Sequence, residues 1–240
     1  MFRYLAPVIC IALGFFSIVF STSVKAQVAT GAADQYSVQV NEVALCSDSS
    51  CSTVFILGNS PTTFDIASAA AGADVGSFSD AAGLQLGAIF THIRITISRT
   101  ITVDGSITDG GNLAGIANTT CRTSAANDGG AAANATTAAD GSEGTGTANT
   151  AQALFVPSPL SFGGGTLPTN ASYTDEGVTI PLGASTLIVT KALTDSFTVA
   201  EEPPSIKVSF NTATALGAFN GGANDCKMIP QPPTMSITIN

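Results

Sequence analysis

The segment Thr91–Val103, THIRITISRTITV, decides the fold class of this 240-residue chain. Apolar β-branched residues recur at every second position but one, at Ile93, Ile95, Ile97, Ile101 and Val103. Polar residues fill the positions between them, and a period of two is typical of a strand with one buried face. As one straight strand the segment would span about 43 Å, which is long for a globular domain.

Arg99 interrupts this pattern, because it falls in the apolar phase of the strand. A bend or bulge near Ser98 and Arg99 would account for both the length and the buried-phase charge. An arginine at the open end of the core would account for them as well, because its long stem can reach water. The sequence leaves both interpretations open.

The segment before it shows a second strand with a defect. The apolar phase shifts by one residue between Tyr36, Val38 and Val40 on one side and Val43 and Leu45 on the other. Because a one-residue shift moves every side chain to the other face of a sheet, we expect a β-bulge between the two sets.

Shorter segments with strand character, separated by turns rich in Gly and Pro, continue along the chain. We expect strands at Val54–Leu57, Thr63–Ile66, Val178–Leu182, Leu187–Thr190, Phe197–Val199, Ile206–Phe210 and Met235–Ile239, and one short helix or helical turn within Ile66–Ala73. About eight or nine mostly antiparallel strands at this spacing predict an all-β fold, a Greek-key β-sandwich in a single domain over residues 27–240.

Residues 104–151 differ from the rest, because they are rich in Gly, Ala, Asn, Thr and Asp and contain few large apolar side chains. Such a composition buries too little surface to offset the entropy of ordering. We expect a long flexible surface insertion that Cys121 ties down partway.

The first 26 residues have the layout of a cleaved secretory signal. Arg3 is followed by the apolar run Leu5–Phe20 and by small residues at the end of Val24–Ala26. The run is shorter than the roughly 20 residues that span a bilayer. We therefore expect a mature chain that begins at Gln27, has no transmembrane segment, and acts in the periplasm, at the cell surface or outside the cell.

The charge of this mature chain excludes some partners. Six basic side chains stand against 17 acidic ones, a net charge of −11. Nucleic acids and anionic membranes bind clusters of Lys and Arg, so neither is an expected partner.

Four cysteines remain after the signal, Cys46, Cys51, Cys121 and Cys226. An even number in an exported chain predicts disulfides, and four cysteines allow three pairings. The short polar loop from Cys46 to Cys51 lets its ends meet, so we pair these two and pair Cys121 with Cys226. A zinc site is the alternative, but close ligand pairs and further histidines are missing from the sequence.

Three blocks in the first half resemble a known kind of domain. They are Val38-x-Val40-x-x-Val43-x-Leu45-Cys46, Phe64-Asp65-Ile66 and Leu84-x-x-Gly87-x-x-x-Thr91-x-Ile93-Arg94-Ile95. Over residues 35–103 the chain resembles exported bacterial domains of unknown function with a transthyretin-like (prealbumin-like) β-sandwich. Gln85-Leu86 stands where that family usually has Pro, and Phe90 where it has Tyr. The resemblance implies a Greek-key sandwich with a carbohydrate-related or surface role, and no catalytic residues carry over.

Candidate catalytic groups are few. His92 is the only histidine, it lies beside Arg94 on the polar face of the expected strand, and no Gly-x-Ser-x-Gly elbow is present. The acidic pairs Asp175-Glu176 and Glu201-Glu202 are adjacent in sequence and do not face each other across a cleft. Calcium would find oxygen ligands in the Asp and Asn residues of 104–140, although these form no calcium-loop motif.

These observations favour a non-enzymatic protein that serves as a binding or structural module. Its partner would be a protein or glycan at the cell surface, and a filament or surface-layer subunit would associate through strand edges such as Met235–Asn240. The alternative is a secreted hydrolase or glycan-binding protein with a ligand-facing site near His92, Arg94 and the 104–151 loop. The absence of Trp and the scarcity of Tyr weigh against sugar stacking.

Overall fold

The computed structural model describes residues 29–68, 83–108, 120–124, 139–140, 142–143, 150–156, 173–181, 184–201, 206–222 and 225–239. Within these ranges, the side chains of 139–140, 142–143, 206–207, 219–222 and 225–227 are not described. The predicted signal, residues 1–26, lies outside the described residues. The predicted helix within Ile66–Ala73 does so beyond Ser68, and residues 66–68 form a turn.

The described residues form sixteen strand segments, and every pairing between them is antiparallel. The segments are β1 (Ala29–Gly31), β2 (Ala33–Cys46), β3 (Val54–Gly58), β4 (Thr62–Asp65), β5 (Ile89–Ser98), β6 (Thr100–Thr108), β7 (Thr120–Arg122), β8 (Ala139–Asp140), β9 (Ser142–Glu143), β10 (Gln152–Phe155), β11 (Val178–Thr179), β12 (Thr186–Thr198), β13 (Ile206–Asn211), β14 (Leu216–Gly222), β15 (Asp225–Pro230) and β16 (Thr234–Ile239). The prediction of an all-β, sandwich-like fold of antiparallel strands is confirmed. A helical turn at 173–175 accompanies them.

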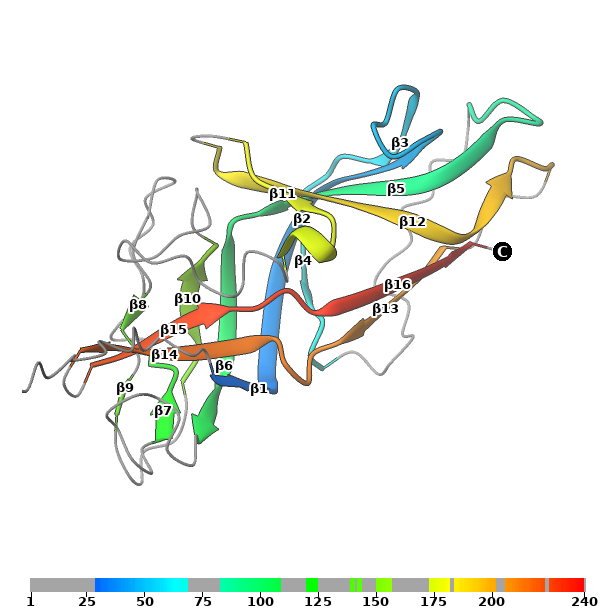
Figure 1. Cartoon of the computed structure of the whole chain (residues 1–240). Helices are drawn as coiled ribbons and strands as arrows, with labels where there is room; N and C mark the ends of the chain where they lie inside the picture. Colours follow the sequence, from blue (N-terminus) through cyan, green and yellow to red (C-terminus); the bar gives the residue numbers. More distant parts are fainter. Residues whose placement is uncertain are drawn as a thin grey trace, which may run out of the picture.

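Strand β2 is the centre of the larger layer, a ten-stranded sheet in the order β11-β12-β5-β2-β6-β7-β9 with β3, β4 and β10 attached beside it. One edge of β2 pairs with β6 and then with β5. Its other edge pairs with β4 and then with β3. The first layer is therefore built around a single long strand (Figure 1).

The predicted defect in Thr91–Val103 is a bend at Arg99. Strand β5 ends at Ser98, β6 begins at Thr100, and Figure 1 shows the chain turning sharply between them. The bend divides the outer edge of this long strand, so that β12 pairs with β5 and β10 pairs with β6. The predicted bulge in β2 is also confirmed, by a register shift between Val40 and Glu42.

The second layer is a long ribbon of two arms that crosses the first (Figure 1), and β1 and β8 pair with its β14–β15 part. One arm runs through β13 and β14, and the other returns through β15 and β16. Pro232 and Pro233 lie between β15 and β16 and interrupt the ladder along this arm, because proline has no N–H to donate. The ribbon is therefore two hairpin segments, β13–β16 over one part of the first sheet and β14–β15 over another.

Two expectations about strands are corrected. Leu187–Thr190 and Phe197–Val199 are not separate strands, because β12 runs from Thr186 to Thr198 with an irregularity between Ala192 and Phe197. No Gly or Pro lies between these residues to end the strand. Strands β14 and β15 were not expected, because their glycines, asparagine and charged residues mask the alternation.

The predicted flexible insertion, 104–151, lies mostly outside the described residues. Its described parts include the end of β6 and all of β7, and the side chains of Ile107 and Cys121 are buried. These parts extend the first sheet beyond the bend.

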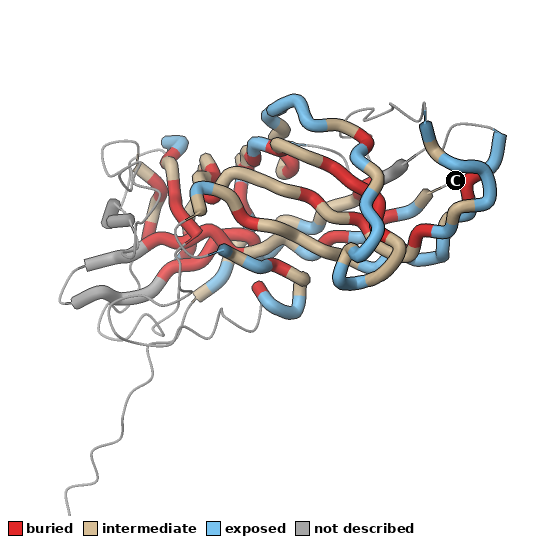
Figure 2. Tube along the Cα trace, turned by 90° about the horizontal axis from the view of Figure 1, so that it is seen from above, coloured by how far each residue is buried: buried red, intermediate tan, exposed pale blue. Residues whose placement is uncertain are grey.

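Buried and exposed segments are distributed unevenly along the molecule. Figure 2 shows exposed segments gathering toward the end that carries the C-terminus. At the opposite end β14 and β15 lie close to the sheet, and the side chains of Leu216 and Met228 are completely buried.

Candidate binding site

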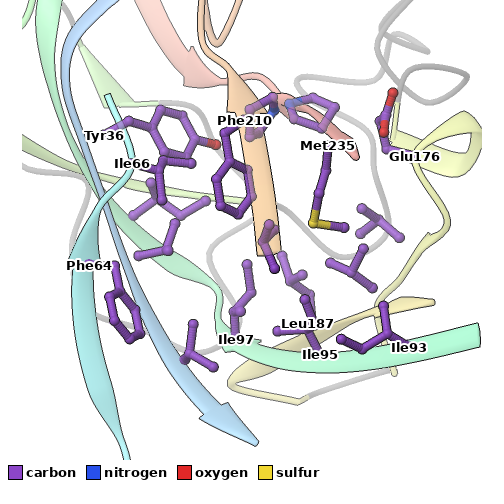
Figure 3. Close-up of a pocket in the computed structure, with 18 of the residues that line it drawn as sticks. Tyr36, Phe64, Ile66, Ile93, Ile95, Ile97, Glu176, Leu187, Phe210 and Met235 are labelled. Atoms are coloured by element: carbon purple, nitrogen blue, oxygen red, sulfur yellow. The ribbon is translucent and has the colours of Figure 1, made fainter. Parts of the chain in front are cut away.

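An apolar cavity of about 110 Å³ lies between the first sheet and the β13–β16 hairpin (Figure 3). Its lining comes from both layers and consists of Tyr36, Val38, Val40, Val43, Phe64, Ile66, Ile93, Ile95, Ile97, Ile101, Tyr173, Glu176, Val178, Leu187, Val189, Val208, Phe210, Pro232, Pro233 and Met235. Apolar cavities on the order of 150 Å³ stay dry and accept small apolar molecules. At about 110 Å³ this cavity is of the same order, which is room for a small apolar molecule or for part of a longer one.

The floor of the cavity follows from the period-two pattern of the sequence. Val43 pairs with Ile95, Ile95 pairs with Val189, and Val189 pairs with Val178, so that one row of side chains crosses four strands. Phe64 on β4 extends the lining by a fifth strand. Five adjacent strands span about 19 Å at the usual spacing, so the lining extends across much of the first sheet.

The roof of the cavity comes from the second layer. Val208 and Phe210 of β13 and Met235 of β16 line it from the ribbon. Pro232 and Pro233 line it where the ribbon changes from one hairpin segment to the other. The interruption of the ribbon therefore lies directly over the apolar floor.

Two buried tyrosines fix the roof to the floor. The Tyr36 hydroxyl donates to the Gln231 carbonyl over 2.8 Å, and the Tyr173 hydroxyl donates to the Pro230 carbonyl. Burial raises the pKa of both hydroxyls above the ordinary value, and for Tyr173 the neighbouring Tyr36 adds to the effect. Both phenols therefore remain protonated donors to adjacent carbonyls of the ribbon.

One rim of the cavity carries an ion pair. Glu176 lines the cavity, and its Oε2 lies 2.6 Å from Nζ of Lys191 on β12. The next residue, Gly177, has φ of 74°, and a Cβ there would lie 2.1 Å from the Thr190 carbonyl oxygen. Only glycine allows this close approach, which brings Glu176 beside β12.

Arg99 occupies the point where the sheet divides. Its side chain is 1% exposed; Nε donates to the Val156 carbonyl over 2.9 Å and one terminal nitrogen donates to the Ala184 carbonyl over 2.7 Å. Burial lowers the pKa of the guanidinium from its ordinary value. Of the two explanations for the apolar-phase arginine, the bend is observed, and the charge is buried rather than exposed at an open end.

The predicted ligand-facing residues, His92 and Arg94, do not line the cavity. Ile93 and Ile95 of the same strand do, and alternation places the two polar side chains on the opposite face. Arg94 pairs with Glu42 at 3.0 Å, and Nδ1 of His92 lies 2.8 Å from the Thr91 hydroxyl. The structure leaves a ligand role for His92 and Arg94 as a prediction.

The predicted Cys46–Cys51 disulfide is confirmed, with the two Cα atoms 4.7 Å apart. In its loop, hydrogen bonds from Ser50 and Ser52 lower the pKa of the Asp48 carboxyl. The bridge fixes the tip of the β2–β3 hairpin.

Cys121 is also disulfide-bonded, and its side chain is completely buried. Its Sγ lies 2.9 Å from Sδ of Met228, two residues along β15 from Cys226. This position favours the predicted Cys121–Cys226 pair, although the Cys226 side chain lies outside the described part of the structure.

Within the described ranges, no three His, Cys, Asp or Glu side chains gather in a way that could hold a metal ion. The residues from which calcium was suggested, within 104–140, lie largely outside those ranges. No helix among the described residues is long and apolar enough to cross a membrane.

In comparisons with protein families, with curated proteins and with solved structures, the chain finds no match. The resemblance to transthyretin-like exported domains therefore stays a prediction. The cavity itself was missed by sequence reasoning, which identified most of its floor as core. The only sequence signal for it was the Pro232-Pro233 pair, placed between two alternating segments.

Proposed function

We propose that the protein is an exported, non-enzymatic binding module that holds an apolar or amphipathic small molecule between its two layers. The observation that carries this proposal is the apolar cavity beneath the interrupted ribbon. The expected secretory signal supplies the compartment, outside the cytoplasm, where a carrier or sensor of such molecules would act.

The physical argument rests on the lining. Burial of apolar ligand surface releases roughly 25 cal/mol per Å², and a cavity that is already formed avoids the cost of opening a packed core. Ligand sites are predominantly apolar with a few polar groups that set orientation. Here the ion pair of Glu176 and Lys191 at the rim provides such groups.

Displacement of a neutral fluorescent probe, N-phenyl-1-naphthylamine, tests the proposal on the mature chain. Val189→Phe fills the cavity, and we expect it to weaken probe binding at least tenfold. The matched control is Ile188→Phe, because residue 188 is the neighbour of residue 189 on the same strand and faces away from the cavity. Equal probe binding by both variants and the unmodified protein would refute the proposal.

Export is tested separately. Sequencing the N-terminus of the protein recovered from outside the cytoplasm should give Gln27 as the first residue. An intact Met1 on that protein would contradict the expected cleavage.

Self-association is a second candidate function, favoured by one observation. Val54 and Ile56 of β3 are 36% and 46% exposed, and β2 is the only described strand that pairs with β3. An apolar edge strand can pair with another chain. The terminal strand β16 likewise pairs with one described strand, β13, so association through Met235–Asn240 stays a prediction. A concentration series by size-exclusion chromatography tests this candidate, and a monomer at every concentration would exclude it.

A further inference from the structure

The rim of the cavity identifies the polar end of the ligand. Among the described lining residues, Glu176 is the only one with a charged side chain. Figure 3 shows Glu176 at the margin of the lining side chains, with the apolar groups on one side of it. A ligand that fills the cavity would therefore meet a carboxylate at this margin and hydrocarbon elsewhere.

The ion pair leaves this carboxylate able to accept further hydrogen bonds. Lys191 contacts Oε2 of Glu176, while its other polar contact, at 3.5 Å, is to the Asp175 carbonyl. A carboxylate can accept about four hydrogen bonds. The Glu176 and Lys191 side chains are only 21% and 24% exposed, so a new donor at the rim would be partly shielded from water.

The position of Glu176 matches one end of the apolar floor. Val178, two residues later, is the last member of the row that runs from Val43 through Ile95 and Val189. Phe64 lies at the other end, on β4. A linear molecule laid across the strands would therefore place its head beside Glu176 and its tail toward Phe64.

The charge of Glu176 at the rim determines which polar head group of a ligand is accepted. Glu176 lines the cavity, whereas Lys191 does not and is engaged by Glu176. A ligand with a carboxylate head would first meet the negative charge of Glu176. The chain as a whole is also acidic, with a net charge of −9. Resting on the proposed function, we propose that the ligand is a single-chain amphiphile whose head donates hydrogen bonds, a long-chain amine or alcohol rather than a fatty acid.

Three probes with the same tail test the head-group preference. Dodecylamine, dodecanol and dodecanoate are compared as competitors of the neutral probe on the mature chain, below their micellar concentrations. We expect the amine to bind most tightly, followed by the alcohol, with dodecanoate at least tenfold weaker than the amine. Dodecanoate binding as tightly as the amine would overturn the inference.

Glu176→Gln is the decisive variant. It removes the charge and frees Lys191, so we expect the amine to lose its advantage and dodecanoate to gain affinity. Binding of the neutral probe is measured on the same variant, to report separately whether the cavity is intact. The matched control is Glu42→Gln, because Glu42 also pairs with a cation but on the opposite face of the sheet, and the ranking should not change.

The two proposals fail in different ways. If the neutral probe does not bind, or binds equally to Val189→Phe, the cavity is not the site and both proposals fall. If the probe binds and Val189→Phe blocks it, but the three heads rank equally or dodecanoate ranks first, only the head-group inference is wrong.

Discussion

The molecule has two halves, divided by the bend at Arg99, and they use the same strand pattern with different results. We call the part built from β5, β12, β13 and β16 the cavity half, and the part built from β6, β10, β14 and β15 the packed half. In the packed half Val103, Leu154, Leu216 and Met228 have no exposed surface. In the cavity half, residues with the same alternation line an open space.

The difference lies in the second layer rather than in the first. In the packed half β14 and β15 lie close to the sheet, and β14 contacts β6 directly. In the cavity half the ribbon has just passed through Pro232 and Pro233, where its pairing is interrupted. Alternation is thus sufficient to make an apolar face, but the fit of the opposite layer decides whether that face becomes core or cavity.

The hydrogen bonds and ion pairs also differ between the two halves. In the packed half, Gln152 accepts from the Ser124 N–H, and Thr123 exchanges hydrogen bonds with Gly105, all within the protein. At the rim of the cavity half, in contrast, the polar contact is the partly exposed ion pair of Glu176 and Lys191. Exposed pairs contribute little stability, which suits a region that admits a ligand.

The observed Cys46–Cys51 disulfide and the predicted Cys121–Cys226 disulfide give the largest expected contrast. Replacing Cys121 and Cys226 together by Ala should lower the free energy of unfolding by about 5 kcal/mol, because a bridge across about a hundred residues restricts the unfolded chain strongly. Replacing Cys46 and Cys51 should cost about 2 kcal/mol, because that loop is short. Equilibrium urea unfolding measures both losses. Equal losses, or a non-reduced peptide map that does not join Cys121 to Cys226, would contradict this expectation.

The bend supplies the next contrast, between two arginines of one long strand. Arg99→Met should lower the free energy of unfolding by about 3 kcal/mol, because the Val156 and Ala184 carbonyls lose buried donors. Arg94→Met should cost less than about 1 kcal/mol, because its pair with Glu42 is partly exposed. The same urea experiment compares them, and a small loss for Arg99→Met would show that the bend does not depend on its side chain.

The tyrosines that join the ribbon to the sheet predict a pH dependence. Burial raises the folded-state pKa of Tyr36 and Tyr173 above the ordinary value of 10.0. The stability they contribute is complete below pH 10 and is lost as the pH rises above it, because only the unfolded state then ionises readily. Above pH 10 the free energy of unfolding should fall by about 1.4 kcal/mol per pH unit for each tyrosine.

Tyr173→Phe checks this prediction. The variant should lose about half of the alkaline slope between pH 10 and pH 11, although its stability at pH 8 falls by about 1 kcal/mol with the lost hydrogen bond. An unchanged slope would mean that Tyr173 is not buried as a donor to Pro230.

The smallest expected effect is the difference between the two halves in the stability cost of one added methylene group. Val103→Leu, in the packed half, should cost about 1–3 kcal/mol because the added methylene has no space. Val38→Leu, whose side chain borders the cavity, should cost less than about 1 kcal/mol. Thermal unfolding of the two variants is the measurement, and an equal cost would indicate that no usable space exists beside Val38.

Local chemistry determined a large part of this protein from its sequence. The alternation in Thr91–Val103 specified a strand, the misplaced Arg99 marked its bend, and the phase shift after Val40 marked the bulge in β2. The short polar loop specified the Cys46–Cys51 bridge. These features were predictable because each depends on residues that are close together along the chain.

Tertiary structure alone decided the candidate site. The sequence shows that Val43, Ile95 and Val189 face one side of their strands, but not that they align in one row, because register is set between distant segments. It also places Glu176 beside Asp175 and Gly177 without indicating that Lys191 lies 2.6 Å away. Whether an apolar face is filled or left open depends on the path of the second layer across it, and this path results from long-range packing.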